Sequence, residues 1–383
     1  MRVLHTSVNK LDLAAVRNQR GFSLLELLIA MVIFLIITGA IYGLMEVGRI
    51  DRNRASRRAD IQKNARVAVH LIGRDALNAG LSFHRAGAVT PDNFVSTLLD
   101  VPPDVDLDRD LLTSIVAGNN VYANNINPDT SVRTDSISFA FRDMDFNPDT
   151  SLPAVQQVGR LVMLQNVTNP SGSPAVPRVR TLAANGAAVA RPYHLYLVES
   201  DTTQVAVMAT NVQGTNQIDA APGDPLGLNQ PLNGAGADGS VLRQCVDQND
   251  ENCTTYVASM KRFFLVQYRV NPDGTLVRRV FGNNVGAAAA DQIQEQPLAY
   301  NVQDMQIDYV LKDGTVTATP NAGPDGIVGT VDDFTEGFNM IRQITVRISV
   351  QSSENDERTG LPEVITLSAT FASEDACAPV VSF

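Results

Sequence analysis

Hydrophobic and polar positions follow two different patterns along the chain. An almost unbroken apolar run begins at Phe22 and reaches about Met45, which is long enough for a helix to cross the hydrocarbon core of a bilayer. From there to about Ala79, apolar residues recur at helical spacing and no proline interrupts them. The pattern predicts one continuous helix, whose second half is amphipathic and packs on a globular head. Gly80 is well placed to end this helix.

After the helix, the pattern changes to short alternating stretches separated by turn residues, as in strands and loops. Two segments, 119–129 and 212–240, are rich in turn-forming residues, and we predict loops for both. The predicted fold class is α+β: a long N-terminal helical stem, hydrophobic and then amphipathic, packed on a β-rich globular head with long loops. The predicted strands are 135–142, 160–165, 193–199, 203–209, 256–270, 275–281, 298–311, 341–350 and 363–371.

The apolar run contains one charged residue near its start, Glu26. A charged side chain at the centre of a membrane helix costs about 2.5–3.5 kcal/mol on insertion scales, so such a residue is a functional hypothesis that needs a partner. If the chain is cut after Gly21, the new amine at Phe22 lies about one helical turn from Glu26, on the same face. The alternative is that Glu26 only favours the positive end of its own helix dipole, worth about 0.3–1 kcal/mol.

The run Gly21-Phe22-Ser23-Leu24-Leu25-Glu26 stands behind a basic leader and resembles the class III signal of type IV pilins and secretion pseudopilins. The resemblance implies that a membrane aspartyl peptidase, the prepilin peptidase, cuts after Gly21 and methylates the new amine of Phe22. It also implies that Glu26 pairs with the terminal amine of a neighbouring subunit. A secretory signal peptide is disfavoured, because its cleavage site would follow the apolar region.

Two further segments resemble the PilW family of minor pilins. One is the helix end Arg74-Asp75-x-x-x-Ala79-Gly80, and the other is the order of strands from about Leu298 to the C-terminus. This resemblance implies a complex with other minor pilins and the major pilin that primes the pilus and sits at its tip, with a large tip adhesin as a further partner. Residues 85–255 carry no such resemblance. The predicted segments are a leader (1–21), a transmembrane and filament-core helix (22–46), an amphipathic stem helix (47–80) and a β-rich head (81–383).

The signal also decides the predicted location. The leader carries basic residues that favour a cytoplasmic N-terminus, but five arginines between 49 and 58 crowd the other side of the apolar run, so charge alone leaves the orientation open. The resemblance implies a single pass through the bacterial inner membrane with the head in the periplasm. The protein then moves into the extracellular pilus.

Composition and motifs narrow the function classes. The 383 residues carry a net charge of −11, which argues against a nucleic-acid partner for the protein as a whole. Phosphate-binding, dinucleotide, metalloprotease and nucleophile-elbow motifs are missing from the sequence, so we predict no enzymatic activity and no required cofactor.

The cysteines and one glycine-rich segment give two lesser predictions. Cys245 and Cys253 bracket a polar acidic loop and are expected to form a short disulfide ring in an oxidising periplasm, which leaves Cys377 unpaired in the chain. Further on, glycines between 321 and 333 can fold the backbone so that three carboxylates converge on a calcium ion. A turn without metal is the alternative. The carboxylates are Asp325, Asp332 and Asp333.

Two functional alternatives stay open at this point. A minor pseudopilin of a type II secretion system has the same signal and stem, although its head is usually smaller. An adhesin or ligand-binding module that uses the stem only for display is the other alternative, and its binding region would be 85–255.

Overall fold

The structure is a computed structural model of the whole chain. The contacts within it divide the chain into two units, Met1–Ser56 and Arg57–Phe383. The residues that the structure describes are 22–81, 83, 87–102, 110–147, 161–162, 176, 178–180, 189–199, 204–214, 217–229, 259–320 and 341–372.

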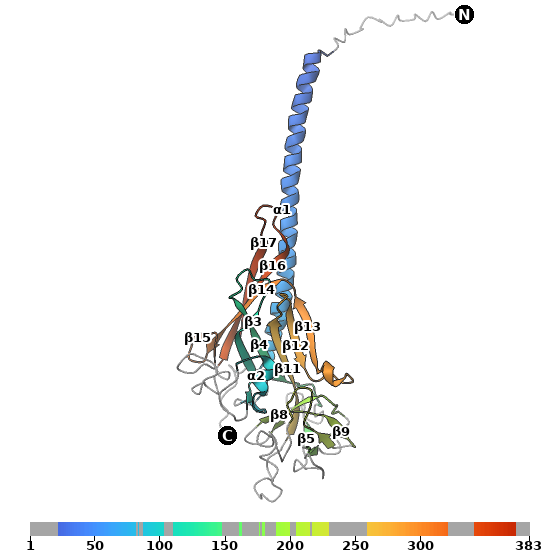
Figure 1. Ribbon diagram of the computed structural model, residues 1–383, viewed down its shortest axis with the longest axis vertical. Coiled ribbons are helices and arrows are strands. Elements are labelled where there is room, and N and C mark those ends of the chain that lie inside the picture. Colours follow the sequence, from blue (N-terminus) through green and yellow to red (C-terminus); the bar gives the residue numbers. More distant parts are fainter. Residues whose placement is uncertain are drawn as a thin grey trace, which may run out of the picture. The chain divides into compact units, whose positions relative to one another are not determined.

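The described part of the first unit is the beginning of helix α1 (Leu24–Asn78; Figure 1). Every large apolar side chain from Phe22 to Val47 is exposed, by 47% to 88%. The most apolar 18-residue stretch has a mean hydropathy of 2.7 and none of it is buried. By length and composition, α1 is therefore a helix that can cross a membrane. The predicted long N-terminal apolar helix is confirmed.

Within the second unit, α1 changes character. Its buried residues recur at intervals of three and four and so lie on one face. Three of these seven residues are alanine, which lets strands approach the helix axis closely. Gly73 serves the same purpose, because a Cβ at this position would collide with the ring of Phe371. The helix ends before Gly80, whose φ of 83° is readily accessible only to glycine. The buried positions are Ile61, Ala65, Ala68, Ile72, Gly73, Asp75 and Ala76.

The described strands form three sheets, which confirms the α+β class. The largest has the order β13-β12-β11-β7-β8-β1-β2, with β4 and β5 also paired to β11 and β3 paired to β4. A second sheet has the order β15-β14-β16-β17, and a third has the order β6-β10-β9. Their bounds are β1 Ala88–Val89, β2 Leu111–Leu112, β3 Ile115–Ala123, β4 Arg133–Arg142, β5 Leu161–Val162, β6 Arg178–Arg180, β7 Leu195–Glu199, β8 Gln204–Met208, β9 Asn211–Gln213, β10 Gln217–Asp219, β11 Ser259–Val270, β12 Leu276–Phe281, β13 Ile293–Ala299, β14 Val302–Leu311, β15 Val316–Thr317, β16 Ile341–Asn355 and β17 Pro362–Ala372.

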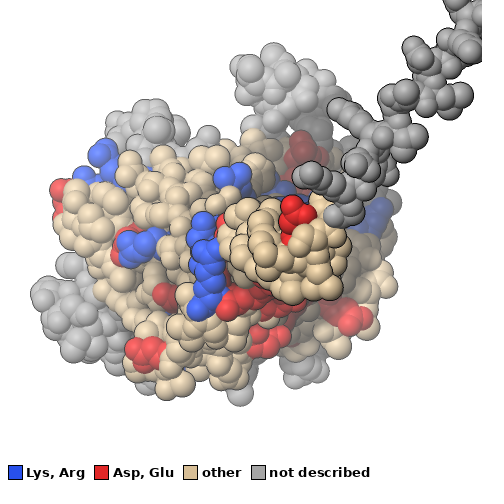
Figure 2. Space-filling view, turned by 90° about the horizontal axis from the view of Figure 1, so that it is seen from above, with Lys and Arg blue, Asp and Glu red and all other residues tan. Residues whose placement is uncertain are grey.

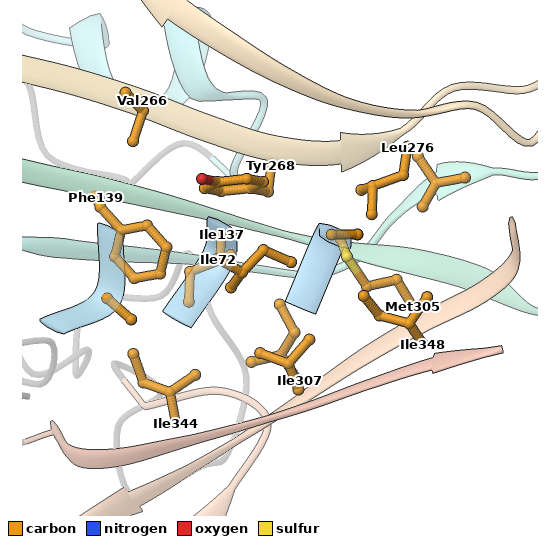
Figure 3. Close-up of a cluster of buried hydrophobic side chains, with 14 of the residues drawn as sticks. Ile72, Ile137, Phe139, Val266, Tyr268, Leu276, Met305, Ile307, Ile344 and Ile348 are labelled. Atoms are coloured by element: carbon orange, nitrogen blue, oxygen red, sulfur yellow. The ribbon is translucent and has the colours of Figure 1, made fainter. Parts of the chain in front are cut away.

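The main core lies around the second half of α1, between two sheets. Figure 3 shows Ile72 with Phe139 and Tyr268 of the large sheet on one side and Ile307 and Ile344 of the β14–β16–β17 sheet on the other. All five side chains are at most 1% exposed. Burying a side chain of this size contributes about 1.5–3 kcal/mol. Both sheets thus pack on the second half of α1, which lies between them.

Two smaller cores complete the second unit. One packs the short helix α2 (Phe94–Leu99) against β7, β8 and β11. The other packs β6, β9 and β10 against the opposite side chains of β7 and β8. Strand β11 connects these layers to the main core, since Ser259–Arg262 pairs with β7 while Phe263–Tyr268 pairs with β4.

Two loop predictions were wrong in part. Strand β3 runs through Asn119 and Asn120 to Ala123, because a bulge places these polar residues inside the strand; Asn120 has a φ of 53°. The segment after Val212 includes β10, and its next turn is ordered by the buried Asp224. The carboxylate of Asp224 accepts backbone N–H groups from Leu226, Leu228 and Asn229.

The predicted strands were confirmed within the described residues, where their ends differ by a few positions; the strand predicted at 160–165 is described only at Leu161–Val162. The exception is the predicted strand 298–311, which is interrupted at Asn301, where a φ of 58° separates β13 from β14. The elements α2, η4 (Ala289–Gln292), β1, β2, β6, β9, β10 and β15 were not predicted, because each has six residues or fewer and shows no clear period.

Candidate assembly site

The carboxylate of Glu26 accepts a hydrogen bond within the first turn of α1. The backbone N–H of Leu25 donates to Ser23 Oγ at 3.2 Å, and the backbone N–H of Ser23 donates to Glu26 Oε2 at 3.0 Å. This reciprocal pair is a capping box, in which an N-cap serine and a glutamate three residues later satisfy two backbone donors that the helix leaves free. Glu26 therefore caps its own helix in the isolated chain.

The capping box was not among the interpretations drawn from the sequence. Those interpretations gave Glu26 either an amine partner or a dipole interaction. The pattern Ser23-Leu24-Leu25-Glu26 is the Ser-x-x-Glu signature of a capping box. This signature marks the capping box in the sequence itself.

The capped arrangement leaves Glu26 able to take a second partner. An ionised carboxylate has about four lone-pair sites, and the backbone N–H of Ser23 uses one of them. Phe22 is the residue next to this N–H and is 88% exposed. A charged amine at Phe22 would be a stronger donor than the backbone N–H, since hydrogen bonds between ionised groups are roughly twice as strong as neutral ones. The carboxylate of Glu26 can thus accept a charged amine in addition to, or in place of, the backbone N–H of Ser23.

Small residues in the same apolar segment are also uncovered. A Cβ built at Gly39 or Gly43 meets no atom within 4 Å, and the same is true of Gly48. These glycines have no packing role in the isolated chain. In lipid, small residues four apart allow two helices to approach closely. Figure 2 looks down on the end of α1 that carries this segment, where most of the helix surface is uncharged.

At its other end, α1 is fastened to the head through Asp75, which is 1% exposed. Its carboxylate accepts a hydrogen bond from Tyr268 Oη at 2.7 Å and one from Arg278 Nε at 2.8 Å, both on the large sheet. Arg74 also contacts it, at 3.0 Å. Burial and the adjacent carboxylate raise the pKa of the Tyr268 hydroxyl, which therefore stays protonated and donates. The Arg-Asp pair noted in the sequence thus joins the end of the stem helix to β11 and β12.

The head contains a second buried polar cluster around His194. Its Nδ1 lies 3.1 Å from Tyr196 Oη, and its Nε2 lies 3.4 Å from Arg262. Burial, together with Arg262 and Arg191, lowers the pKa of His194 to about 4, so the ring is neutral near pH 7. Arg262 is in turn paired with Asp143. The cluster is enclosed by packed side chains and holds β7 to β11.

Several predicted site residues lie outside the described residues, and their roles stay predictions. Among the residues that the structure does describe, no group of three or more His, Cys, Asp or Glu side chains is arranged to hold a metal ion. Phe22 and Glu26 lie within the described residues, and their roles in methylation and subunit pairing stay predictions. Outside the described part lie Gly21, Cys245, Cys253, Cys377, Asp325, Asp332 and Asp333.

Comparison with known proteins bears on the first unit. The family model described as the prokaryotic N-terminal methylation motif matches residues 16–42. A comparison with curated proteins finds no match. The motif and the exposed apolar helix together support a type IV pilin-like or pseudopilin-like protein that is anchored in a membrane, processed by prepilin peptidase and assembled with other pilins. They suggest a structural subunit rather than an enzyme.

Proposed function

We propose that the chain is a minor pilin of the PilW type, cut after Gly21, methylated at the amine of Phe22 and built into a type IV pilus. One observation carries the proposal. Glu26 is the only charged residue in an exposed apolar stretch of α1 that lies within the methylation motif, and a capping box already positions its carboxylate. A membrane helix with such a carboxylate needs an external partner, because an uncompensated charge in hydrocarbon is costly.

The proposed mechanism is assembly. In the precursor, the apolar part of α1 lies in the inner membrane and the head lies in the periplasm. On entry into the filament, its apolar residues exchange lipid for the helices of neighbouring subunits, and close packing and non-directional apolar contact hold them there. Glu26 then accepts the methylated amine of a neighbour and sets the axial register, since a charge pair at low dielectric is strongly position-dependent.

The proposed partners follow from the resemblance. They are prepilin peptidase, the other minor pilins, the major pilin and a large adhesin at the tip. In this role the chain takes part in priming the pilus and stays near its tip. Its uncovered apolar stretch supports a place among other helices, and the β-rich head supports a surface subunit with its own core.

The test compares carboxylates on the same helix. Glu26→Val and Glu26→Gln are expected to insert in the membrane normally but to enter filaments at least about tenfold less, the change expected from loss of about 1.4 kcal/mol. The control is Glu46→Gln, because Glu46 is exposed and pairs with Arg49 at 2.6 Å. Normal incorporation of both Glu26 variants would refute the role of this residue.

Mass spectrometry of sheared surface filaments and of the remaining envelope distinguishes the functional alternatives. The peptide that begins at N-methylated Phe22 is expected at low abundance in the sheared filaments. Finding it only in the envelope would favour a type II secretion pseudopilin. Finding an uncut Gly21-Phe22 bond would mean that the apolar helix is a simple anchor.

A further inference from the structure

The β14–β16–β17 sheet ends at a long open edge. Strand β17 pairs with β16 from Ala372 opposite Gln343 to Pro362 opposite Asn355. Among the described residues, no strand pairs with the other side of β17. An open edge of this length presents a row of backbone N–H and C=O groups that can bind another strand.

An apolar groove of about 520 Å³ lies beside this edge, between β17 and the second half of α1. The helix contributes Val69, Gly73 and Leu77, and the strand contributes Leu367 and Phe371. Leu77 is 52% exposed although it is a large apolar residue. The inward-facing side chains of β17 are likewise only partly buried, whereas those of β16 are almost completely covered. Within the described part of the chain, the sheet therefore leaves this side of α1 partly uncovered.

The groove has a basic rim in a chain of net charge −11. Arg66, His70 and Arg74 line it at intervals of four residues, so they form one row along the helix. No carboxylate is among the residues that line the groove. The surface therefore favours an occupant with apolar side chains toward the groove and acidic side chains toward this row.

We infer that β17 and this groove are the docking site for an extended strand of a different subunit, which carries alternating apolar residues and at least one carboxylate. The strand adds to the open edge of β17, so that its backbone pairs with the free N–H and C=O groups. Every second side chain then enters the groove over Leu77 and Phe371. Its carboxylate pairs with Arg66, since Arg74 already contacts Asp75. The inference rests on the proposed function in one respect, because the partner is taken to be another subunit of the same assembly.

The experiment places a photo-crosslinking amino acid at Ser368, an exposed residue of β17 beside the groove, in the full chain expressed in its native host. Crosslinked peptides are then identified by mass spectrometry. Two variants disturb the groove: Leu77→Lys puts a charge on its floor, and Arg66→Glu reverses the sign of its rim. Their matched controls are Val67→Lys and Lys63→Glu, at exposed positions of the same helix that do not line the groove.

The expected result is a crosslink to a segment of another protein with the alternating apolar and acidic pattern. Its yield should fall about tenfold in both groove variants, which corresponds to about 1.4 kcal/mol, and should stay within about twofold of the parent in both controls. Crosslinks only to residues 373–383 of the same chain, to a second copy or to lipid would overturn the inference, as would a crosslink that neither groove variant weakens.

The same samples separate this inference from the proposed function. N-methylated Phe22 in the sheared filaments reports on processing and assembly independently of the groove. If methylated protein is present in filaments and no partner strand is crosslinked, the docking site is refuted and the pilin assignment stands. If Phe22 is never exposed by cleavage, the pilin assignment fails, and a crosslink to an acidic strand would then identify a partner outside a pilus.

Discussion

From Leu24 to Val47, α1 carries large apolar side chains that are all exposed, whereas from Ile61 to Ala76 four of its seven buried positions are alanine or glycine. The apolar half buries nothing within the described chain, and the more polar half forms the centre of the main core. Hydrophobicity alone therefore does not tell which part of this helix the protein covers by itself. The exposed half has the composition expected for lipid or for other helices, and the buried half has the small residues that two flanking sheets require.

Small residues serve different purposes in the two halves. Gly73 has no Cβ, and this leaves room for the ring of Phe371 of the same chain. Gly39 and Gly43 have no neighbour within 4 Å of a Cβ. If the proposed function is correct, the space at Gly39 and Gly43 is filled by other subunits. The comparison can therefore be tested by changes that affect one half and leave the other unaffected.

The largest expected effect comes from Asp75→Asn, which removes the charge that joins the buried half to the sheet. Arg278 would be left with a partly buried and uncompensated charge, because its side chain is 14% exposed. Breaking a buried pair in this way costs about 3–5 kcal/mol of unfolding free energy. The measurement is urea unfolding of the full chain in detergent, followed by tyrosine fluorescence, since the chain has no tryptophan.

Arg74→Gln is the control for this change. Arg74 also contacts Asp75, but its side chain is 53% exposed. Pairs that solvent reaches contribute about 0–1 kcal/mol, so the control should lose little. Equal losses of unfolding free energy in Asp75→Asn and Arg74→Gln would show that the contact with Arg278 contributes no more to stability than the contact with Arg74.

The next effect compares one isoleucine in each half. Ile72→Ala opens a cavity between the two sheets and should lower the unfolding free energy of the head by about 2–5 kcal/mol. Ile36→Ala removes a side chain that is 67% exposed and should change the unfolding free energy of the head by less than about 0.5 kcal/mol. The same unfolding curves report both. A large loss with Ile36→Ala would mean that the exposed half contributes to the stability of the head.

The contrast between the halves also explains which parts of the fold could be predicted from the sequence. The helix was predictable because its pattern is long and unbroken, and β11, β12, β16 and β17 were predictable because they alternate over many residues. Strand β3 (Ile115–Ala123) was not predicted, and its second half was predicted as a loop, because its polar residues form a bulge. Asp135 stabilises this bulge from the next strand by accepting the N–H of Asn120 at 2.8 Å. Such pairings between distant residues leave no local period.

At the candidate site, the sequence supplied the residue types but not all of their contacts. The motif predicted the importance of Glu26 from its charge, but the capping bond to Ser23 required the geometry of the first turn. Asp75 was noted only as part of a helix end. Its burial depends on Tyr268 and Arg278, which lie 193 and 203 residues further along the chain. The groove beside β17 could not be predicted, because it arises from an edge that no local pattern marks.

The pH dependence of stability is expected to arise in the sheet that packs on the buried half, through Asp135 of β4. Burial, and the nearby Asp304 and Asp308, raise the pKa of Asp135 to about 6. This carboxyl therefore contributes stability that is fully present below its unfolded pKa near 4 and is lost as the pH rises through about 6. The loss is about 3 kcal/mol, since each pKa unit is worth about 1.4 kcal/mol. Asp135→Asn should be less stable relative to the parent at pH 4 than at pH 7, by up to this amount.

His194 provides the control of opposite sign for this prediction. Its pKa is lowered to about 4 because the folded state favours the neutral ring. The neutral ring therefore contributes stability that is present above the unfolded pKa near 6.5 and is lost as the pH falls through about 4. The variant His194→Gln should therefore lose less unfolding free energy than the parent as the pH falls from about 6.5 to about 4. Parallel stability profiles for the parent and Asp135→Asn between pH 4 and 7 would contradict the assignment to Asp135.

The smallest expected effect lies at the start of the exposed half. Ser23→Ala removes the oxygen that accepts the N–H of Leu25 and should cost about 0.5–2 kcal/mol of local helix stability. This loss affects only the first turn, because the buried half is stabilised independently by its core. Faster hydrogen exchange at the amides of Leu25 and Glu26, with unchanged urea unfolding of the head, is the expected result. A matching loss in the head would mean that the two halves of α1 unfold as one cooperative unit, and the distinction between them would then hold for packing but not for stability.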